Sequence, residues 1–404
     1  MERKNCLICN QKKINDIINL GMHPFADTFI NRERIYESED IYPLIVQLCS
    51  NCGNIQTKIE TPTNERYNKF DYSYTSSNSD FAKNHWKSFY GDIHKKLNVD
   101  SNKLIFEIGS NDGYLLKLFK KNKNLVLGID ASSYMTKIAN KNKIRTENLI
   151  FDIDTSNKIL KKYGKADIII ANNVFNHSDN PLNFVKSIKK VLKSEGMFVF
   201  EVPYWLNSIN YKKYDQIYHE HISYFTIKSL NYLFKKNKLY INDFDIVNYH
   251  GGSLRVFVSN IKNNNNVRKK ISSQINLEKK LNCFNLDFYK KFSNEIGRDK
   301  IKLITRLLAL KKKDSIIIAV GAAAKANTFL NYHGLNSSII SFITDTSIHK
   351  KGKLTPLSRI KIEDDNIFKN YKNVFALILS WNIADKIKKN LKNINSKIKF
   401  ISVS

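Results

Sequence analysis

Leu104-Ile105-Phe106-Glu107-Ile108-Gly109-Ser110-Asn111-Asp112-Gly113 is the stretch that predicts the fold. The five residues before the first glycine are mostly apolar and predict a buried strand, and the two glycines predict a tight turn into a helix at about residues 114–119. A second apolar strand, at residues 125–129, ends in Asp130, which lies 21 residues beyond Gly109. A carboxylate at this distance reaches ribose hydroxyls in nucleotide-binding α/β folds, so the stretch indicates a doubly wound sheet that binds a nucleoside.

The turn after the first strand differs from a dinucleotide-binding turn. Asn111 stands at the second glycine position of the G-x-G-x-x-G pattern, and no pyrophosphate cradle follows. A G-x-x-x-G turn with Glu107 upstream suits S-adenosylmethionine, which carries an amino-acid end and a sulfonium in place of phosphates. We therefore predict that this cofactor is bound by the turn and the strand ends after it, including an acid placed to meet the adenine edge (Asp152). The predicted cofactor residues are Glu107, Gly109, Asn111, Gly113, Asp130, Asp152, Asn172 and Asn173.

Further strands and helices follow in the same pattern. They are expected at residues 167–173 (a strand and its exit), 181–192 (a helix opened by Pro181), 197–203 (a strand) and 227–234 (a helix capped by Thr226). Gly251-Gly252 then interrupts what reads as one strand over residues 246–258. A glycine pair inside a strand indicates a bend, or a backbone that another group approaches closely.

A second α/β unit begins after residues 264–312, which read as charged helices able to bridge two domains. Strands are expected at 315–320 and 339–344, and the second ends at Asp345. Between them lies the small-residue turn Gly321-Ala322-Ala323-Ala324-Lys325-Ala326-Asn327-Thr328. Such a turn lets a ligand phosphate meet helix N–H groups, with Lys325 supplying charge. The alternative is that the small residues serve only close helix–sheet packing.

Four of the five cysteines form two C-x-x-C pairs, Cys6 with Cys9 and Cys49 with Cys52. Each pair offers two sulfurs at bonding range of one ion, and zinc is held tetrahedrally by four thiolates. The N-terminus has no apolar signal core, so a metal site is favoured over disulfides, and we expect a cytoplasmic protein. Since all four ligands are cysteines, the predicted role of zinc is structural.

Composition bounds the remaining possibilities. The 404 residues predict two or three domains, and 66 Lys+Arg against 37 Asp+Glu give a net charge of +29. These lysines are dispersed along the chain rather than gathered in one stripe, so nucleic-acid binding is not favoured. No apolar run is long enough for a membrane span.

The densest group of reactive side chains is Tyr218-His219-Glu220-His221, which follows the predicted fifth strand by a short loop. Imidazole, carboxylate and phenol groups can exchange protons near neutral pH, and in doubly wound folds reacting groups gather outside the carboxyl ends of the strands. One histidine in a loop is usually only a satisfied polar residue. Two histidines, a glutamate and a tyrosine beside a cofactor turn favour an active site.

Taken together, these motifs resemble the sugar-nucleotide C-methyltransferases of bacterial deoxysugar pathways. The two cysteine pairs, residues 107–113 with Leu115-Leu116, residues 215–225 and residues 321–328 are each similar to a part of that family, and together they cover nearly the whole chain. The resemblance implies a zinc-binding module (1–68), a Rossmann-like methyltransferase domain (69–247) and a C-terminal Rossmann-like domain (248–404). It also implies that a nucleotide-diphosphate sugar binds between the last two domains.

The resemblance also implies roles for individual residues. His221 would remove the proton beside a ketone, Glu220 and Tyr218 would orient or polarise it, and a tyrosine or His219 would donate to the enolate oxygen. Tyr74 would face the sugar, with Tyr72 as the competing choice. The substrate side would be formed by Tyr72, His250, Arg255, Gly321, Lys325 and Asn327.

Departures from the family pattern leave the substrate open. Asp130 stands where the family often has Glu, and the segment after Asp345 keeps Lys350-Lys351-Gly352-Lys353 and Pro356 while its interior differs. The nucleotide (dTDP, GDP or CDP) and the sugar therefore stay undetermined. The rival readings are a sugar O-methyltransferase and a zinc-containing methyltransferase that binds nucleic acid. The expected state is a monomer or small homo-oligomer with no membrane partner.

Overall fold

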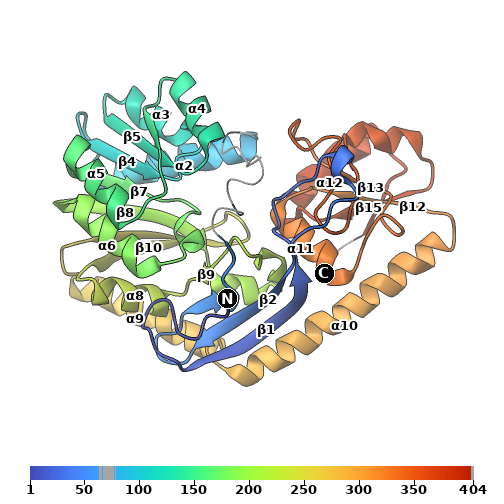
Figure 1. The fold of residues 1–404 in the computed structure, drawn as a ribbon, viewed down its shortest axis with the longest axis horizontal. Helices are drawn as coiled ribbons and strands as arrows, with labels where there is room; N and C mark the ends of the chain where they lie inside the picture. The colour runs from blue at the N-terminus through green and yellow to red at the C-terminus, as the bar shows by residue number, and fades with distance from the viewer. Residues whose placement is uncertain (63–65, 67–76, 78, 402–404) are drawn as a thin grey trace.

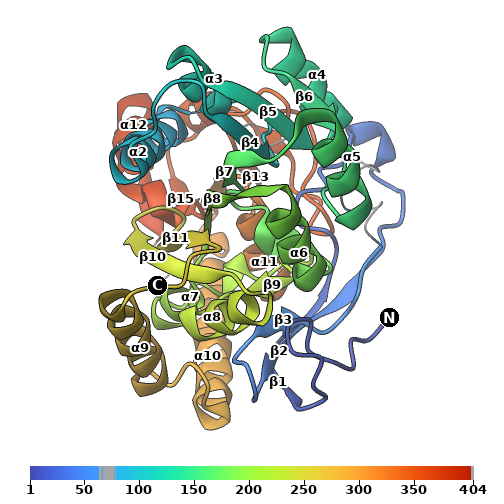
Figure 2. The same ribbon diagram turned by 90° about the vertical axis from the view of Figure 1, so that its left-hand side faces the viewer.

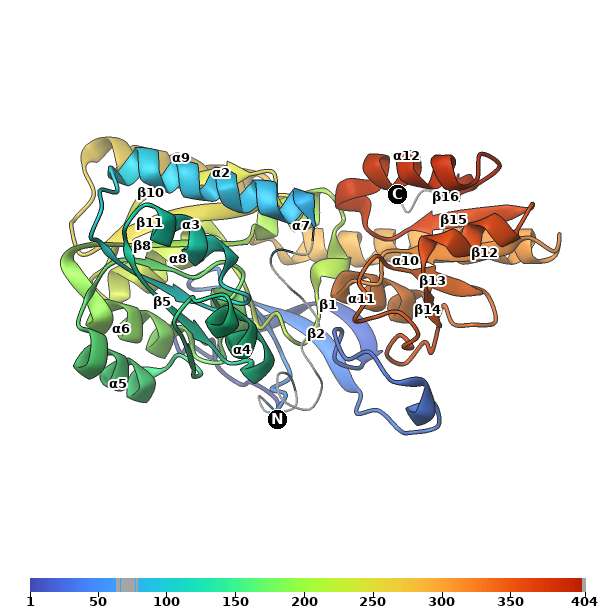
Figure 3. The ribbon, with the colours of Figure 1, turned by 90° about the horizontal axis from the view of Figure 1, so that it is seen from above.

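The computed structural model describes residues 1–62, 66, 77 and 79–401. Within these residues the chain forms three sheets, and Figures 1 and 3 show two α/β lobes side by side with a long helix running from one to the other. The predicted fold class, an α/β protein with a small N-terminal module and two further α/β domains, is confirmed.

The N-terminal module is an antiparallel sheet in the order β1-β2-β3-β9. Its strands are β1 (Ile14–His23), β2 (Tyr42–Cys49), β3 (Ile55–Thr57) and β9 (Ser223–Tyr224). β9 lies far along the chain, and it pairs with β3 through Ile55 opposite Tyr224. The module therefore has its last strand supplied by the segment that carries the Tyr-His-Glu-His residues.

The central domain is a seven-stranded sheet in the order β10-β11-β8-β7-β4-β5-β6 (Figure 2). Its strands are β4 (Leu104–Ile108), β5 (Leu125–Asp130), β6 (Thr146–Asn148), β7 (Ala166–Ile170), β8 (Leu192–Pro203), β10 (Tyr240–Val247) and β11 (Ser253–Ser259). The predicted strands at 104–108, 125–130, 167–170 and 197–203 are confirmed. Strands β4 to β8 run parallel, so their carboxyl ends share one edge.

Helices cover both faces of this sheet because each presents an apolar stripe to it. The helices are α2 (Asp80–Leu97), α3 (Tyr114–Lys121), α4 (Ser133–Lys141), α5 (Ile153–Tyr163), α6 (Pro181–Val191), α7 (Trp205–Asn210) and α8 (Ile227–Lys236). Side chains of α2 and α3 share one buried cluster with β4 and β7, while α5, α6 and α8 contribute to the cluster on the other face. Thr226 caps α8 as predicted, since its side chain accepts from Ser229 N in a reciprocal capping box.

The prediction of one interrupted strand over residues 246–258 is wrong. β10 and β11 form an antiparallel hairpin in which Val247 lies opposite Ser253, and Gly251 and Gly252 turn the chain with φ of +82° and +112°. A hairpin needs these left-handed conformations, and glycine adopts them without a Cβ clash. The predicted boundary between the second and third domains, at residue 247/248, falls in this turn, and β11 still belongs to the central sheet.

Two helices lead to the C-terminal domain, α9 (Asn265–Lys280) and α10 (Leu286–Lys311). α10 contacts both β1 and β12, so the expected bridging helices are present (Figure 1). Among the described residues no helix is both long and apolar enough to cross a membrane.

The C-terminal domain is a parallel sheet in the order β14-β13-β12-β15-β16. Its strands are β12 (Ile316–Val320), β13 (Phe342–Thr344), β14 (Ile362–Glu363), β15 (Val374–Ile378) and β16 (Lys399–Ile401), and its helices are α11 (Ala324–His333) and α12 (Ala384–Ile394). The predicted strand at 339–344 is shorter than expected, and α11 begins inside the predicted small-residue turn.

Candidate active site

The four paired cysteines form one buried cluster. The Sγ atoms of Cys6 and Cys52 lie 3.5 Å apart, those of Cys9 and Cys49 also lie 3.5 Å apart, and all four lie within 4.8 Å of one another. Four thiolates bound tetrahedrally at about 2.3 Å from zinc would be separated by roughly 3.8 Å. The arrangement therefore fits a structural zinc ion, as predicted, and leaves no fifth protein group beside it that would suggest catalysis among the described residues.

The predicted cofactor turn is tightly constrained by its neighbours. Gly109 has φ of +67°, and a Cβ there would lie 2.1 Å from Val174 Cγ2. Asp130 Oδ2 accepts from Asn111 N at 2.8 Å, and Asp130 Oδ1 accepts from Ser132 N at 2.8 Å. Each carboxylate oxygen thus keeps a lone pair for a ribose hydroxyl.

Glu107 places a third acidic side chain beside this turn, near Asp112 and Asp130. Its side chain is buried, and Oε2 has no hydrogen-bond partner among the described residues. Burial raises the pKa of Glu107 well above its ordinary value, and the neighbouring Asp112 and Asp130 raise it further. A buried carboxyl group with an open acceptor, close to two further acids, suits a cationic, hydroxyl-bearing ligand such as S-adenosylmethionine.

The other predicted cofactor residues lie around the same edge. Asn172 Oδ1 accepts from Glu201 N at 3.0 Å, and Asn173 donates its N–H to Glu201 O at 2.7 Å with φ of 53°. Gly113 is the N-cap of α3 with φ of +76°. Asp152 is exposed and caps α5, with Oδ1 accepting from Thr155 N at 2.8 Å. Its contact with adenine remains a prediction.

Tyr218 and His221 form a hydrogen-bonded pair. His221 Nδ1 lies 2.9 Å from Gln216 O, and because a carbonyl only accepts, Nδ1 carries the proton. Nε2 is therefore the free base, and Tyr218 Oη donates to it at 2.6 Å. Burial lowers the pKa of His221 to about 3, so the imidazole is neutral at physiological pH. The His177 ring lies 5.0 Å from the His221 ring and joins this pair to the loop after β7.

Glu220 and His219 point to the N-terminal module instead. Glu220 Oε1 accepts from Ala26 N at 2.9 Å and from Asp27 N at 3.1 Å, and His219 Nε2 donates to Tyr42 O at 3.2 Å. The predicted roles of Glu220 in orienting His221 and of His219 as an enolate donor are therefore corrected. Tyr218 and His221 contact each other, while His219 and Glu220 between them contact the N-terminal module, so neighbours in sequence serve different domains.

The C-terminal domain contacts both the N-terminal module and the segment that carries Tyr218 and His221. Asn327 Nδ2 donates to Ala26 O at 2.6 Å, and Thr328 Oγ1 donates to Ile217 O at 3.0 Å. The first turns of α11 thus contact both the module and segment 214–225. Asn327, predicted on the substrate side, is fully buried here and links the C-terminal domain to the N-terminal module.

A cavity of about 430 Å³ opens between the β10–β11 turn and the C-terminal domain. It is lined by Phe81, Asn207, Tyr211, Lys213, Ile246, Val247, Asn248, His250, Gly251, Gly252, Trp381 and Asn382. Two ammonium groups lie close to the Trp381 indole ring, Lys213 at 4.1 Å and Lys325 at 4.0 Å from its centroid, and Nε1 of the indole donates to Asp215 Oδ2 at 2.6 Å.

The charges at this cavity favour an anion. Two lysines face one carboxylate, Asp215, and burial lowers the pKa of Lys325 to about 8. Burial and the positive charge of Lys325 lower the pKa of His250 to about 3. The predicted residues His250 and Lys325 thus lie together here, with Gly321 (φ +96°) behind them against Ser380.

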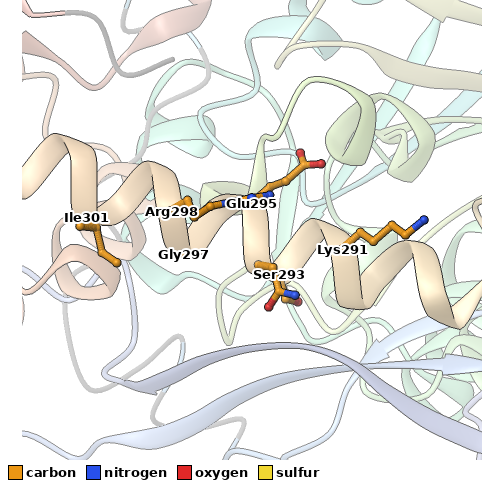
Figure 4. A pocket seen from close by; sticks show the side chains of 7 residues that line it. Lys291, Ser293, Glu295, Gly297, Arg298 and Ile301 are labelled. Carbon is orange, nitrogen blue, oxygen red and sulfur yellow. The ribbon is translucent and has the colours of Figure 1, made fainter.

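A second hollow, of about 630 Å³, is lined by Lys291, Ser293, Asn294, Glu295, Gly297, Arg298 and Ile301. Figure 4 shows that these side chains all come from α10. Because no second element contributes reactive groups, we do not consider it a functional site.

Arg255 has a structural position, which corrects its predicted contact with substrate. Its guanidinium is 2% exposed, and Nε donates to Glu201 Oε1 at 2.6 Å while Nη1 donates to Asp92. Glu201 Oε2 also meets His85 Nε2 at 2.6 Å. The network fastens α2 to the sheet. Tyr72 and Tyr74 lie outside the described residues.

Sequence reasoning missed several residues of the site: His177, Asn207, Lys213, Trp381 and the turn at residues 26–27. His177 could have been found, because it follows the predicted exit of the fourth strand. Trp381 likewise follows a strand end of the second α/β unit. The turn at 26–27 carries no chemical signal, because its backbone makes the contacts.

Comparisons with known proteins agree with this architecture. Residues 6–67 match a putative zinc binding domain, residues 84–242 a methyltransferase domain and residues 248–403 a C-methyltransferase C-terminal domain. The C-methyltransferase NovU of Streptomyces niveus is 25% identical over 387 residues, which cover 96% of this chain and 92% of the relative.

Two solved structures each cover less than half of this chain. Magnesium protoporphyrin IX methyltransferase of Synechocystis PCC 6803 with bound SAH is 14% identical, covering 44% of this chain and 82% of its own, with a TM-score of 0.36. An S-adenosylmethionine-dependent methyltransferase of Clostridium acetobutylicum ATCC 824 is 16% identical, covering 45% and 93%, with a TM-score of 0.36. Scores this low carry no inference about function.

Proposed function

We propose that this S-adenosylmethionine-dependent methyltransferase is a C-methyltransferase, and that it methylates the carbon beside the ketone of a nucleotide-linked 4-keto-deoxysugar. The carbon would be C3, made nucleophilic as an enolate. The observation that carries the proposal is the Tyr218–His221 pair, in which the tautomer leaves Nε2 of a neutral imidazole as the base.

The position of the pair supports this role. His221 contacts His177, and the loop that leads to His177 packs Val174 against Gly109 of the cofactor turn. The base and the cofactor turn therefore share one edge of the sheet. A ketone lowers the pKa of the adjacent C–H, so a neutral imidazole can take that proton.

The pair offers two routes for the proton. Tyr218 is less buried than His221 and holds the hydrogen bond to Nε2, so it is the member that reaches toward a ligand. The C–H proton passes to Nε2 of His221, either directly once Tyr218 turns its O–H to the enolate oxygen or through the phenol itself. Bound S-adenosylmethionine supplies the methyl group on an already activated sulfonium.

The cavity beside Trp381 supports an anionic substrate. Lys213 and Lys325 place two cations beside one indole ring, and α11 begins at Ala324 without a side-chain cap on its first N–H groups. Cations and open helix N–H groups together suit a diphosphate. Dispersed lysines elsewhere need not bind nucleic acid.

The test is incubation with S-adenosylmethionine and a panel of nucleotide-linked 4-keto-6-deoxysugars, with the product analysed by mass spectrometry and NMR. One new methyl group on the carbon beside the ketone is expected. Transfer only to a hydroxyl of a reduced sugar would replace the proposal with O-methylation.

Two matched variants isolate the base. His221→Asn should lower transfer at least about 10²-fold with S-adenosylhomocysteine affinity kept, because general base catalysis is worth roughly 10²–10⁴. His219→Asn is the matched control, because it makes the same substitution at a neighbouring histidine that contacts Tyr42 of the N-terminal module. It should keep transfer in the fraction of protein that folds. Near-normal turnover of His221→Asn would sink the assignment.

A further inference from the structure

The C-terminal domain repeats the strand order of the central domain. Its sheet runs β14-β13-β12-β15-β16, and the first five parallel strands of the central domain run β6-β5-β4-β7-β8 in the same relative chain order. In both sheets the first strand of the unit lies between the second and the fourth. The crevice at which a nucleoside binds in such sheets is therefore present twice in this chain.

The turn after the first strand is also repeated, hydrogen bond by hydrogen bond. In the central domain, Gly109 N donates to Ile129 O at 2.7 Å with φ of +67°. In the C-terminal domain, Gly321 N donates to Thr344 O at 2.7 Å with φ of +96°. A Cβ on either glycine would strike the loop after the adjacent fourth strand, at Val174 or at Ser380.

The acid at the end of the second strand is held in the same way. Asp345 Oδ2 accepts from Ala322 N at 2.9 Å and Oδ1 accepts from Ser347 N at 2.8 Å. Asp130 accepts from Asn111 N and Ser132 N, both at 2.8 Å; the donor in the turn is the second residue after Gly109 and the first after Gly321, while the other donor lies two residues after the acid in both domains. Asp130 is the acid expected to hold the ribose of S-adenosylmethionine, so its counterpart has the geometry for a second ribose.

The lone pairs left on Asp345 set what it can recognise. Each carboxylate oxygen accepts one backbone N–H and keeps one further acceptor position, and the side chain is partly exposed. Two acceptors on one rigid carboxylate match two vicinal hydroxyls. A ribose offers both a 2′-OH and a 3′-OH, and a 2′-deoxyribose offers only one of them.

Positive charge lies on the phosphate side of the same crevice. Lys350 Nζ donates to Ala322 O at 2.7 Å, and Lys325 lies in the first turn of α11. A nucleoside whose ribose meets Asp345 would therefore have its phosphates over the turn at residues 321–325, toward the cavity beside Trp381.

We propose that Asp345 binds the two ribose hydroxyls of the sugar nucleotide, so that this enzyme selects a ribonucleoside diphosphate sugar over its 2′-deoxy counterpart. The inference rests on the proposed function and adds to it the class of nucleotide. It assigns the C-terminal domain the recognition of the nucleoside, while the central domain carries the chemistry.

The test compares matched pairs of nucleoside diphosphates that differ only at the 2′ position, namely UDP with dUDP, CDP with dCDP and GDP with dGDP, and adds dTDP as a further 2′-deoxy ligand. Their affinities for the full chain are measured by calorimetry with S-adenosylhomocysteine present. For the base that binds, the ribonucleotide should bind at least about tenfold more tightly, the loss expected when one hydrogen bond to a charged group is removed.

Variants separate recognition from folding. Asp345→Asn should reduce the ratio between the members of a pair to about threefold or less, with S-adenosylhomocysteine affinity and melting midpoint kept. Asp130→Asn, the matched change in the cofactor turn, should weaken S-adenosylhomocysteine binding and leave the ratio unchanged.

Four outcomes contradict the inference in different ways. Equal affinity of wild-type enzyme for both members of every pair would overturn it and leave the proposed function standing. A ratio that survives in Asp345→Asn would overturn the role of Asp345. Binding of dTDP alone would overturn the inference and leave the proposed function standing. Absence of binding by every diphosphate, dTDP included, would overturn the inference and the proposed function together.

Discussion

Glu220→Gln tests the contact that fastens the N-terminal module to segment 214–225. Burial raises the pKa of Glu220 from its ordinary value of 4.5 to about 7. The carboxyl group therefore keeps its proton up to about pH 7 in the folded protein, while it loses the proton near pH 4.5 in the unfolded chain. The sign follows from this shift: the stability contributed by the neutral carboxyl is fully present below pH 4.5 and is lost as the pH rises through 7. A glutamine at this position is neutral at every pH.

The size of the effect comes from the same numbers. Each pH unit below the folded-state pKa is worth about 1.4 kcal/mol, so wild-type protein gains about 2 kcal/mol from this group between pH 8 and pH 5.5. Glutamine keeps one oxygen for the N–H groups of Ala26 and Asp27 but places an NH₂ where Oε2 has no partner among the described residues. That penalty, about 1–3 kcal/mol, is the same at both pH values and cancels in the comparison.

The assay is urea unfolding of both proteins at pH 8 and pH 5.5. The stability of Glu220→Gln relative to wild type should be about 2 kcal/mol more favourable at pH 8 than at pH 5.5. Glu195→Gln is the control, because its exposed side chain stays in water on folding. If the relative stability of Glu220→Gln is the same at both pH values, Glu220 is charged in the folded protein and the reasoning fails.

Other perturbations give equally direct expectations. Zinc removal by a chelator should abolish methyl transfer yet leave S-adenosylhomocysteine affinity within about twofold, since the ion holds only the N-terminal module; full activity of metal-free protein, checked by atomic emission, would contradict this. Gly251→Ala places a Cβ 2.4 Å from Trp381 Cη2, at a residue with φ of +82°. The KM for the sugar nucleotide should therefore rise at least about threefold, and the free energy of unfolding should fall by about 1–3 kcal/mol. Unchanged kinetics and melting would show that the indole is free to move. Burial lowers the pKa of His219 to about 4 and of His221 and His250 to about 3, so the stability that comes from their neutral forms is present above pH 6.5 and is lost as the pH falls through these values. The free energy of unfolding from urea titrations should therefore fall between pH 6.5 and pH 4, by up to about 1.4 kcal/mol per pH unit for each histidine. A flat profile would refute this expectation.

The sequence was informative where local chemistry decides the structure. Asp130 and Gly109 could be placed because the spacing between a glycine turn and a strand-end acid follows from strand and helix lengths. The cysteine pairs could be placed because C-x-x-C spacing fixes two sulfurs on one knuckle. The Gly251-Gly252 pair was misjudged because a hairpin turn and a bend in one strand have the same local composition, and only the pairing of β10 with β11 separates them.

Contacts between domains were beyond the reach of local patterns. Glu220 and His221 are neighbours in sequence, yet one carboxylate meets backbone N–H groups of residues 26–27 and the other side chain meets a phenol three residues away. Arg255 read as a cation for the substrate because its partners, Glu201 and Asp92, are distant in sequence. The residue type predicts what a side chain can bind, but the tertiary structure decides whether another part of the protein already occupies it.

The pairing of β3 with β9 has a consequence for how the protein is made. Synthesis proceeds at about 5–20 residues per second, so the ribosome must add the 167 residues between Thr57 and Tyr224 before the first sheet can receive its last strand, which takes roughly 10–30 s. The knuckles with Cys6 and Cys49 emerge much earlier and can capture metal while the edge of β3 is still unpaired. An unpaired edge is a site for misassociation, so early zinc loading would protect the nascent chain, and zinc-starved cells should accumulate aggregated rather than merely inactive protein.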